Sequence, residues 1–230
     1  MPEINPNPLN WKPAPIPCPA TLRGRYATLE PLDAARHGES LFEAVKSHNE
    51  LWTWLAASPP ESATALTENL EKWQKAERAV LFAIVPRETG RAAGHASYMR
   101  IEPSHGAIEV GNVLFSPGLQ RTRAATESMY LMARHVFEDL GYRRYEWKCN
   151  AENVPSRRAA LRLGFTFEGI FRQHMVVKDH NRDTAWFSML DSEWTARKEV
   201  FEAWLNPANF DGEGNQKRSL ANIFAAQVKP

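Results

Sequence analysis

The chain has 230 residues, a length that fits one domain with extensions or at most two small domains. Apolar residues make up 43% of it and charged residues 24%, the ordinary composition of a globular protein with a sizeable core. The formal net charge of +1 gives no electrostatic reason to expect a nucleic-acid or anionic-membrane partner. Cys18 and Cys149 form neither a metal-ligand pair nor a disulfide framework, which indicates a reducing compartment.

The first 19 residues predict an extended arm stiffened by proline. Prolines recur along this stretch without any apolar run, so it does not resemble a secretory signal peptide. The arm is expected either to lie over the domain or to stay mobile. No segment of the chain is long and apolar enough to span a bilayer, and the expected location is the cytoplasm.

Hydrophobic periodicity in the first half of the chain alternates between strand and helix patterns. Asp33 is placed to cap a first helix, and Ser62 stands at the start of a second helical repeat. The segment 108–115 is mostly apolar, which favours a central strand. In chain order the predicted elements are a strand over 21–29, helices beginning at Asp33 and near Ser62, and strands over 80–85, 94–99 and 108–115.

The second half predicts a long amphipathic helix, a hairpin and a C-terminal extension. The long helix carries apolar residues on one face up to Leu140 and stops at Gly141. Trp194 and Trp204 lie on an aromatic stripe that either packs back on the sheet or pairs with a second subunit. The remaining elements are a strand over 145–149, a short helix from Pro155 to Leu163, strands over 165–177 and 184–190 around the loop 178–183, a helix over 192–205 and a polar tail.

These patterns together predict an α/β (α+β) fold with a mixed central sheet flanked by helices. One domain is expected over residues 20–191. Residues 1–19 then form an N-terminal arm, and residues 192–230 form a C-terminal helix and tail.

The junction between the strand 108–115 and the next helix has the composition of a phosphate-binding turn. A helix N-terminus presents unpaired backbone N–H groups and the positive end of the helix dipole, so it attracts phosphate. Ala124 and Ala125 are small enough to let a pyrophosphate approach the backbone, and Arg121 and Arg123 can add charge-assisted contacts. Taken alone, a strand–turn–helix unit with two arginines more often has only a structural role, in which the helix packs against the sheet.

Further motifs surround this junction in a defined order. They are Glu109-Val110-Gly111, Gln120-x-x-Arg123-x-Ala125 followed by Thr126-Glu127, Asn153-Val154-Pro155-Ser156, Leu163-Gly164-Phe165, and Glu168-Gly169 with Arg172. In these motifs the chain resembles the GNAT superfamily of acetyl-CoA-dependent N-acetyltransferases, and within it the RimJ/RimL-like branch that modifies protein N-termini and various small amines. The resemblance covers roughly residues 19–191. It departs from the family loop Q/R-x-x-G-x-G/A at Arg123, where a glycine is usual and the arginine adds bulk.

The resemblance implies acetyl-CoA as the cosubstrate and no metal. The pantetheine arm would bind backbone groups of the central strand at Val113, Leu114 and Phe115, and an amide near Leu114 would stabilise the developing oxyanion. Asn153 would contact the pantetheine region, cap the helix ahead of Pro155, or do both. The residues that would hold the pyrophosphate are Gln120, Arg121, Thr122, Arg123, Ala124, Ala125 and Thr126.

Two residues are the predicted catalytic pair under this resemblance. Ser156 aligns with a serine proposed to protonate the departing thiolate. The tyrosine that other members use for this step falls at Ala160 and is absent here. The alternative role of Ser156 is to cap a helix. Glu109 aligns with a carboxylate able to take a proton from the attacking ammonium, and its alternative role is that of an ion-paired strand residue. Glu168 and His174 are weaker candidates for the base.

The sequence does not identify the acceptor amine. The first two helices and the hairpin are expected to bind it, with Trp54, Arg172 and His174 as candidate contacts. Trp54 equally fits a core position. Arg172 and Arg182 either bind a carboxylate, which favours an amino-acid-like or peptide acceptor, or form a solvated charged face.

The predicted function is therefore transfer of an acetyl group from acetyl-CoA to a primary amine, whether a protein N-terminus, an amino acid or another small amine. Because the amine attacks directly in such a reaction, Cys149 is expected to be a packing residue and not a nucleophile. The alternative, from another class, is a non-catalytic acyl-CoA-binding module on the same fold. The expected partners are the amine substrate and, as an open question, a second copy in a homodimer; no nucleic acid or membrane is expected.

Overall fold

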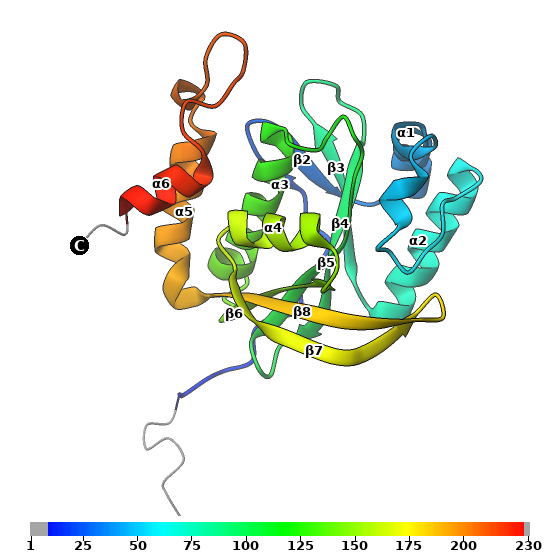
Figure 1. Cartoon of the computed structure of the whole chain (residues 1–230), viewed down its shortest axis with the longest axis horizontal. Coiled ribbons are helices and arrows are strands. Elements are labelled where there is room, and N and C mark those ends of the chain that lie inside the picture. The colour runs from blue at the N-terminus through cyan, green and yellow to red at the C-terminus, as the bar shows by residue number, and fades with distance from the viewer. Residues whose placement is uncertain (1–8, 228–230) are drawn as a thin grey trace, which may run out of the picture.

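The computed structural model describes residues 9–227, and an eight-stranded sheet lies at its centre (Figure 1). The strands lie in the order β1-β2-β3-β4-β5-β6-β8-β7, and each neighbouring pair is antiparallel except β5 and β6, which are parallel. The predicted mixed sheet is thus confirmed. The strands are β1 (Leu22–Arg23), β2 (Ala27–Pro31), β3 (Val80–Pro86), β4 (Gly94–Glu102), β5 (Ala107–Phe115), β6 (Arg144–Asn150), β7 (Thr166–Val177) and β8 (His180–Leu190).

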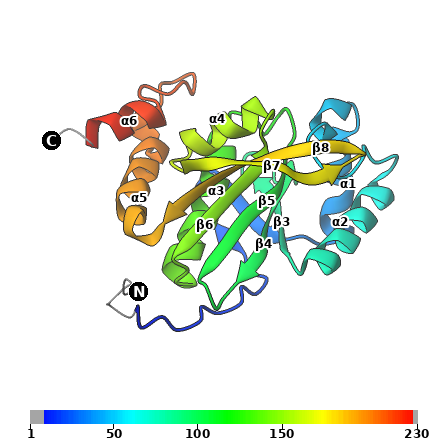
Figure 2. The same ribbon diagram turned by 60° about the horizontal axis from the view of Figure 1, so that its bottom comes forward.

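Helices cover both faces of this sheet. α1 and α2 lie over one face, and α3 and α4 lie over the other with α5 beside α3 (Figures 1 and 2). Along β3, Leu81 and Ala83 belong to the core under α1 and α2, whereas Phe82 and Ile84 belong to the core under α3, as the two-residue period of a strand requires. The helices are α1 (Ala34–Val45), α2 (Ala63–Glu77), α3 (Arg123–Arg134), α4 (Val154–Arg162), α5 (Asp191–Leu205) and α6 (Leu220–Gln227).

The predicted helix starts are confirmed. The side chains of Asp33 and Ser62 each accept a hydrogen bond from the amide three residues further on. The long helix ends differently from the prediction. α3 stops at Arg134, and one π-helical turn (His135–Asp139) carries the chain on towards Gly141.

The single strand predicted over 21–29 is wrong, because the chain turns between β1 and β2. The cause is Glu127 on α3, whose side chain is buried. Its carboxylate accepts hydrogen bonds from three successive amides, those of Arg25 (2.8 Å), Tyr26 (2.5 Å) and Ala27 (2.7 Å). A Cβ at Gly24 would lie 2.3 Å from a carboxylate oxygen of Glu127, so the turn needs glycine there.

The hairpin of β7 and β8 is tighter than predicted. The expected loop 178–183 shrinks to Lys178 and Asp179, whose φ angles of 50° and 61° are both left-handed. Two successive left-handed residues are typical of a type I′ turn, which matches the twist of paired strands. The Lys178 ammonium donates a 2.9 Å hydrogen bond to the Trp52 carbonyl, which ties the hairpin tip to the segment between α1 and α2 (Figure 2).

The aromatic stripe of α5 packs within the molecule, against α3 and the π-helical turn that follows it. The ring centroids are 6.1 Å apart for Trp194 and Tyr130, 5.2 Å for Trp194 and Phe137, and 5.5 Å for Phe201 and Tyr130. The tail also contains structure that its composition did not indicate. Phe210 and Gln216 form a β-bridge, and Leu220 and Ile223 of α6 are buried.

The described part of the N-terminal arm lies over the domain. Residues 9–21 have no regular secondary structure. The amide of Ala14 donates to the Pro103 carbonyl (3.1 Å), and the hydroxyl of Tyr142 donates to the Pro15 carbonyl (3.0 Å). Residues 1–8 of the predicted arm lie outside the described residues.

Replacing Glu127 with glutamine should destabilise the fold. An amide presents one oxygen instead of two and brings an N–H₂ group among three donors, so we expect the free energy of unfolding to fall by about 3 kcal/mol. The matched control is Glu43→Gln, which removes a solvent-exposed pair with Lys46 and should cost less than about 1 kcal/mol. Urea titration measures both; equal losses would contradict the role given to Glu127.

Candidate active site

The sheet separates between its two parallel strands. Residues 107–110 of β5 pair with residues 144–147 of β6, and the pairing then stops. Beyond Val110, β5 pairs only with β4, and beyond Trp147, β6 pairs only with β8. The described structure therefore has a gap in the middle of the sheet, where backbone groups of Val113, Leu114 and Phe115 are free of a strand partner on one side.

A bulge in β5 accompanies the gap. Asn112 has a φ of 47°, and the register of β5 against β4 shifts beside it. The hydroxyl of Ser97 donates to the Gly111 carbonyl (2.8 Å), and His95 Nδ1 donates to the Asn112 carbonyl (2.9 Å). Both donors lie on β4 and were not among the predicted site residues. The sequence offered only their place at alternate positions of one strand.

His95 is held in its neutral form. Burial lowers the pKa of His95 to about 4, although the hydrogen bond to Asn112 acts in the opposite direction. Since Nδ1 donates to a carbonyl, the proton of the neutral ring is on that nitrogen. His95 thus supports the bulge as a fixed hydrogen-bond donor.

The start of α3 lies directly after this part of β5. The hydroxyl of Thr122 caps the helix by accepting a hydrogen bond from the Ala125 amide (3.1 Å). The amides of Arg121, Arg123 and Ala124 make no hydrogen bond within residues 9–227. Gln120 turns back, and its side-chain amide donates to the Phe115 carbonyl (3.0 Å). The predicted phosphate-binding turn therefore has three free N–H groups next to the gap.

The side chains of Arg123 and Thr126 point away from these amides. The guanidinium carbon of Arg123 lies 4.8 Å from the ring centre of Tyr26 and 5.0 Å from that of Phe210. The hydroxyl of Thr126 accepts hydrogen bonds from Arg162 (3.2 and 3.3 Å). The bulk that distinguishes Arg123 from the family glycine is therefore stacked on aromatic rings.

Ser156 lies beside the end of the β5–β6 pairing. Its hydroxyl oxygen accepts a 3.0 Å hydrogen bond from Nε1 of Trp147, the last paired residue of β6. Asn153 accepts a 3.0 Å hydrogen bond from the Ser156 amide and so caps α4. Cys149 is buried here; burial raises the pKa of its thiol, while a hydrogen bond with Ser156 acts in the opposite direction.

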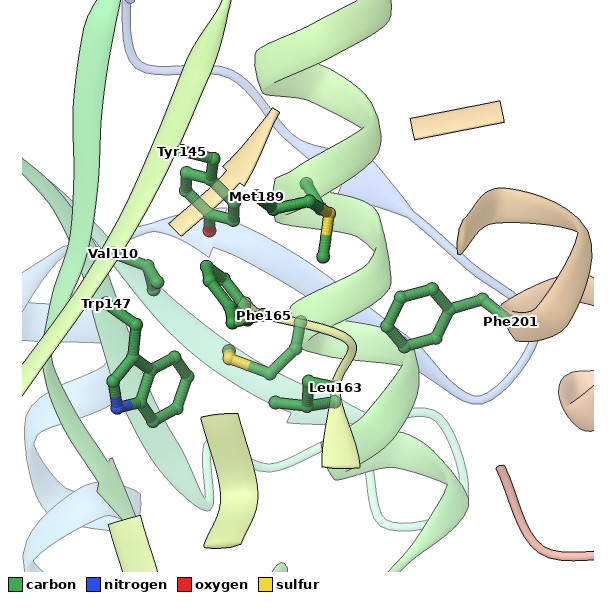
Figure 3. A pocket seen from close by; sticks show the side chains of 9 residues that line it. Val110, Tyr145, Trp147, Leu163, Phe165, Met189 and Phe201 are labelled. Atoms are coloured by element: carbon green, nitrogen blue, oxygen red, sulfur yellow. The ribbon is translucent and has the colours of Figure 1, made fainter. Parts of the chain in front are cut away.

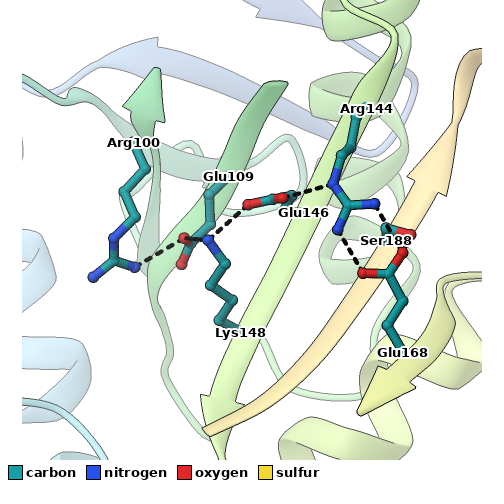
Figure 4. Close-up of polar contacts among 7 residues, drawn as sticks. All are labelled: Arg100, Glu109, Arg144, Glu146, Lys148, Glu168 and Ser188. Atoms are coloured by element: carbon teal, nitrogen blue, oxygen red, sulfur yellow. Dashed lines mark hydrogen bonds and ion pairs between the residues drawn. The ribbon is translucent and has the colours of Figure 1, made fainter. Parts of the chain in front are cut away.

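Glu109 belongs to a network of ion pairs on the opposite face of the sheet (Figure 4). Its buried carboxylate lies 2.9 Å from Nη1 of Arg100 and 3.1 Å from Nζ of Lys148. Lys148 also contacts Glu146 (2.6 Å). Glu109 is therefore an ion-paired strand residue, and its role as a base remains a prediction.

The second carboxylate proposed as a base is engaged at the far end of the same network. Arg144 holds Glu168 through two parallel hydrogen bonds of 2.8 and 2.5 Å, and Ser188 donates a third of 2.7 Å. The bonds from Arg144 lower the pKa of Glu168. A carboxylate with a lowered pKa is a weak base, so Glu168 is poorly suited to accept a proton.

The predicted acceptor contacts lie around the hairpin. Trp54 is 37% exposed, in contrast to Trp52, which is buried in the core under α1 and α2. Arg172 is exposed. His174 shares a 2.9 Å hydrogen bond with the hydroxyl of Thr184 on β8. Lys178 ties the hairpin to the segment between α1 and α2, and Trp54 and His174 lie in these two segments. Their role in binding stays a prediction.

A small cavity lies in the core beneath the last paired residues of the two parallel strands (Figure 3). Its volume is about 10 Å³, which is room for no more than one water molecule. Its walls are almost wholly apolar. The lining residues are Val110, Met129, Ala133, Tyr145, Trp147, Leu163, Phe165, Met189 and Phe201. This cavity is a packing defect and not a ligand site.

Two further features of residues 9–227 bear on other classes of function. In this part of the chain no group of three or more His, Cys, Asp and Glu side chains is arranged to hold a metal ion. None of its helices combines the length and apolar character needed to cross a membrane.

The chain is similar in sequence and in structure to proteins that are described as acetyltransferases. A family model described as an acetyltransferase (GNAT) domain matches residues 27–166. A crystal structure of a GCN5-related N-acetyltransferase from Brucella melitensis is 49% identical in sequence with a TM-score of 0.91, covering 94% of this chain and 99% of that one. An uncharacterized N-acetyltransferase, YnaD of Bacillus subtilis, is 26% identical over 52% of this chain and 69% of its own. The ribosomal-protein-serine acetyltransferase of Escherichia coli is 29% identical over 44% of this chain and 56% of its own.

The buried neutral His95 should make stability depend on pH. The unfolded chain binds a proton at His95 with an ordinary pKa of about 6.5, whereas the folded chain does so only near pH 4, so the unfolding free energy falls as the pH drops through this window. Between pH 7 and pH 5, we expect the unfolding free energy of His95→Gln, which keeps a donor for Asn112, to fall by about 2 kcal/mol less than that of the parent. Urea titrations at the two pH values measure this; identical pH dependence in both proteins would contradict it.

Proposed function

This chain belongs to the GNAT family of acetyl-CoA-dependent acetyltransferases, and we propose that it transfers the acetyl group directly to a primary amine. The resemblance inferred from the sequence motifs, including that to the RimJ/RimL-like branch, is confirmed by these relatives. The candidate amines are a protein N-terminus, an amino acid or another small amine. One observation carries the proposal: the gap between β5 and β6 lies next to free backbone amides at the start of α3.

The free amides and the gap support a defined position for the coenzyme. Diphosphate oxygens would accept hydrogen bonds from the amides of Arg121, Arg123 and Ala124, and the helix dipole favours their charge. The pantetheine arm would then run along the unpaired side of β5, from Phe115 towards Val113. This path carries the thioester to the gap. An amide near Leu114 is then available to the carbonyl oxygen as it gains negative charge.

Ser156 is suited to protonate the leaving group. When the amine nitrogen attacks the thioester carbonyl carbon, an N–C bond forms, the C–S bond breaks and the sulfur leaves as a thiolate. Because Trp147 donates to the oxygen of Ser156, that bond does not use the hydroxyl proton, which can be donated either to the sulfur of Cys149 or to the leaving group. Water can restore the proton afterwards. Ala160, where other members carry a tyrosine, is fully buried and supplies no proton.

The charge network offers a carboxylate for the proton of the amine. Glu109 lies between Arg100 and Lys148. The attacking amine must be neutral, so the proton of its ammonium form would pass to Glu109 or to water beside it.

The proposed reaction is tested by thiol release from acetyl-CoA in the presence of peptides, free amino acids and polyamines. A transferase releases coenzyme A thiol only when an acceptor is added, and acetylated acceptor accumulates in equal amount. The competing function, a non-catalytic acyl-CoA-binding module, predicts coenzyme binding without release by any amine. That result would overturn the proposal.

Replacing Ser156 with alanine should slow the chemical step. We expect kcat to fall by about tenfold to a hundredfold with little change in the KM for acetyl-CoA, because the serine acts on the leaving group. Ser219→Ala is the matched control, since the hydroxyl of Ser219 also accepts a hydrogen bond from an N–H group, the amide of Asn222, but lies in the tail. Equal activity of the Ser156→Ala and Ser219→Ala variants would rule out the role of Ser156 as an acid.

Reversing the charge at Arg121 should weaken coenzyme binding. Arg121→Glu places a carboxylate beside the amides that would hold the diphosphate, so we expect the Kd for coenzyme A to rise by about tenfold or more. Lys75→Glu makes the same change in charge on α2 and should leave Kd unchanged. Isothermal titration measures both constants, and indistinguishable values would place the diphosphate elsewhere.

A further inference from the structure

β8 presents a row of side chains to the face of the sheet that carries Glu109. Arg182, Thr184 and Trp186 lie at alternate positions of β8 and so share one face of the strand. Trp186 pairs with Lys148 of β6, whose ammonium lies 3.8 Å from the centre of the Trp186 ring. Arg182 acts electrostatically on Glu109 and Arg100, so the row lies along the edge of the charge network.

The guanidinium of Arg182 has no counter-ion. It makes no ion pair or hydrogen bond to the residues between 9 and 227, and its Nε is buried without a partner. Burial lowers the pKa of Arg182. Cys149 and Glu109 act in the opposite direction, but burial raises the pKa of the Cys149 thiol, and Glu109 is already held by Arg100 and Lys148. Removing a cation from water without an anion is unfavourable, so the site lacks a negative group that a ligand can supply.

The unsatisfied groups on this face are all donors. Besides Arg182 Nε, the indole Nε1 of Trp186 is buried and has no hydrogen-bond partner within the described residues. A ligand that satisfies two N–H groups must offer acceptor oxygens. A carboxylate does so and also neutralises a guanidinium, whereas a polyamine has only positive charge to offer.

The ion pairs of this network do not include Arg182. Glu109, Glu146 and Glu168 are all engaged in ion pairs with Arg100, Arg144 and Lys148. Glu77 also acts electrostatically on Arg100. Among these four cations, Arg182 is the one that forms no ion pair with the residues between 9 and 227.

We propose that the acceptor is an amine that also carries a carboxylate, and that Arg182 binds this carboxylate while the amino group reaches the gap. The inference rests on the proposed acetyl transfer and adds the chemical class of the acceptor. Arg182 is in this role a specificity-determining residue. The carboxylate can be the α-carboxylate of a free amino acid or the acidic side chain of a peptide's first residue, and matched acceptors distinguish the two.

The test compares kcat/KM for acceptors that differ only in the carboxylate. Free amino acids are paired with their carboxamides, and peptide amides that begin with Asp are paired with those that begin with Asn. We expect one of these pairs to favour the carboxylate by about tenfold to a hundredfold. Equal use of both members in both pairs, or a preference for polyamines, would overturn the proposal.

Arg182→Gln should remove this preference. We expect a rise in KM of about tenfold or more for the carboxylate acceptor, little change for its amide, and an unchanged KM for acetyl-CoA. Arg182→Lys should keep part of the preference. The matched control is Arg158→Gln, an exposed arginine on α4 that should behave as the parent. An equal loss for both members of a pair, or a change confined to acetyl-CoA, would assign Arg182 another role.

Two further measurements separate a failure of this inference from a failure of the proposed function. Removing an unpaired, half-buried charge should leave the melting temperature of Arg182→Gln equal to that of the parent or higher, whereas a structural arginine predicts a lower one. If no amine releases thiol, acetyl transfer is overturned. Isothermal titration of free amino acids and of the paired peptide amides onto the parent and Arg182→Gln then decides the carboxylate site on its own, since binding to both or to neither protein would refute it.

Discussion

The left-handed backbone of Asn112 is the constraint on which the rest of the site depends. Asparagine tolerates this conformation better than most residues do, yet it still needs support from its surroundings. Ser97 and His95 provide that support by binding the carbonyls of Gly111 and Asn112 from β4. β5 therefore pairs with β4 on both sides of the bulge, and the proposed coenzyme path and oxyanion amide lie where its pairing with β6 has ended.

The alternation of side chains along the strands gives the two faces of the gap different chemistry. Val110 and Trp147 belong to the apolar core under α3 and α4, and Ser156 contacts Trp147 from that side. Glu109 and Lys148, one residue removed in each strand, point to the charged face. Under the proposed function, the coenzyme would meet neutral N–H and O–H donors on one face, and the acceptor would meet fixed charges on the other.

Local patterns in the sequence predicted the parts of the fold that depend on local physics. Side-chain caps at Asp33 and Ser62 follow from residues three apart, and the strands follow from alternation. The missed features depend on contacts between distant segments. Glu127 bends a strand some hundred residues away, and the ion pairs of Glu109 come from two neighbouring strands. The turn at Lys178 was missed for another reason, since it lacks the glycine that usually marks a left-handed position.

The stacking of Arg123 links the proposed coenzyme loop to two residues outside the range 27–166 that the family model matches. Tyr26 follows the turn held by Glu127, and Phe210 belongs to the tail beyond α5. Phe210 and Tyr26 together hold the guanidinium of Arg123 on aromatic rings at the start of α3. A residue of the C-terminal tail thus helps to fix the position of a positive charge at the helix that is proposed to bind the diphosphate.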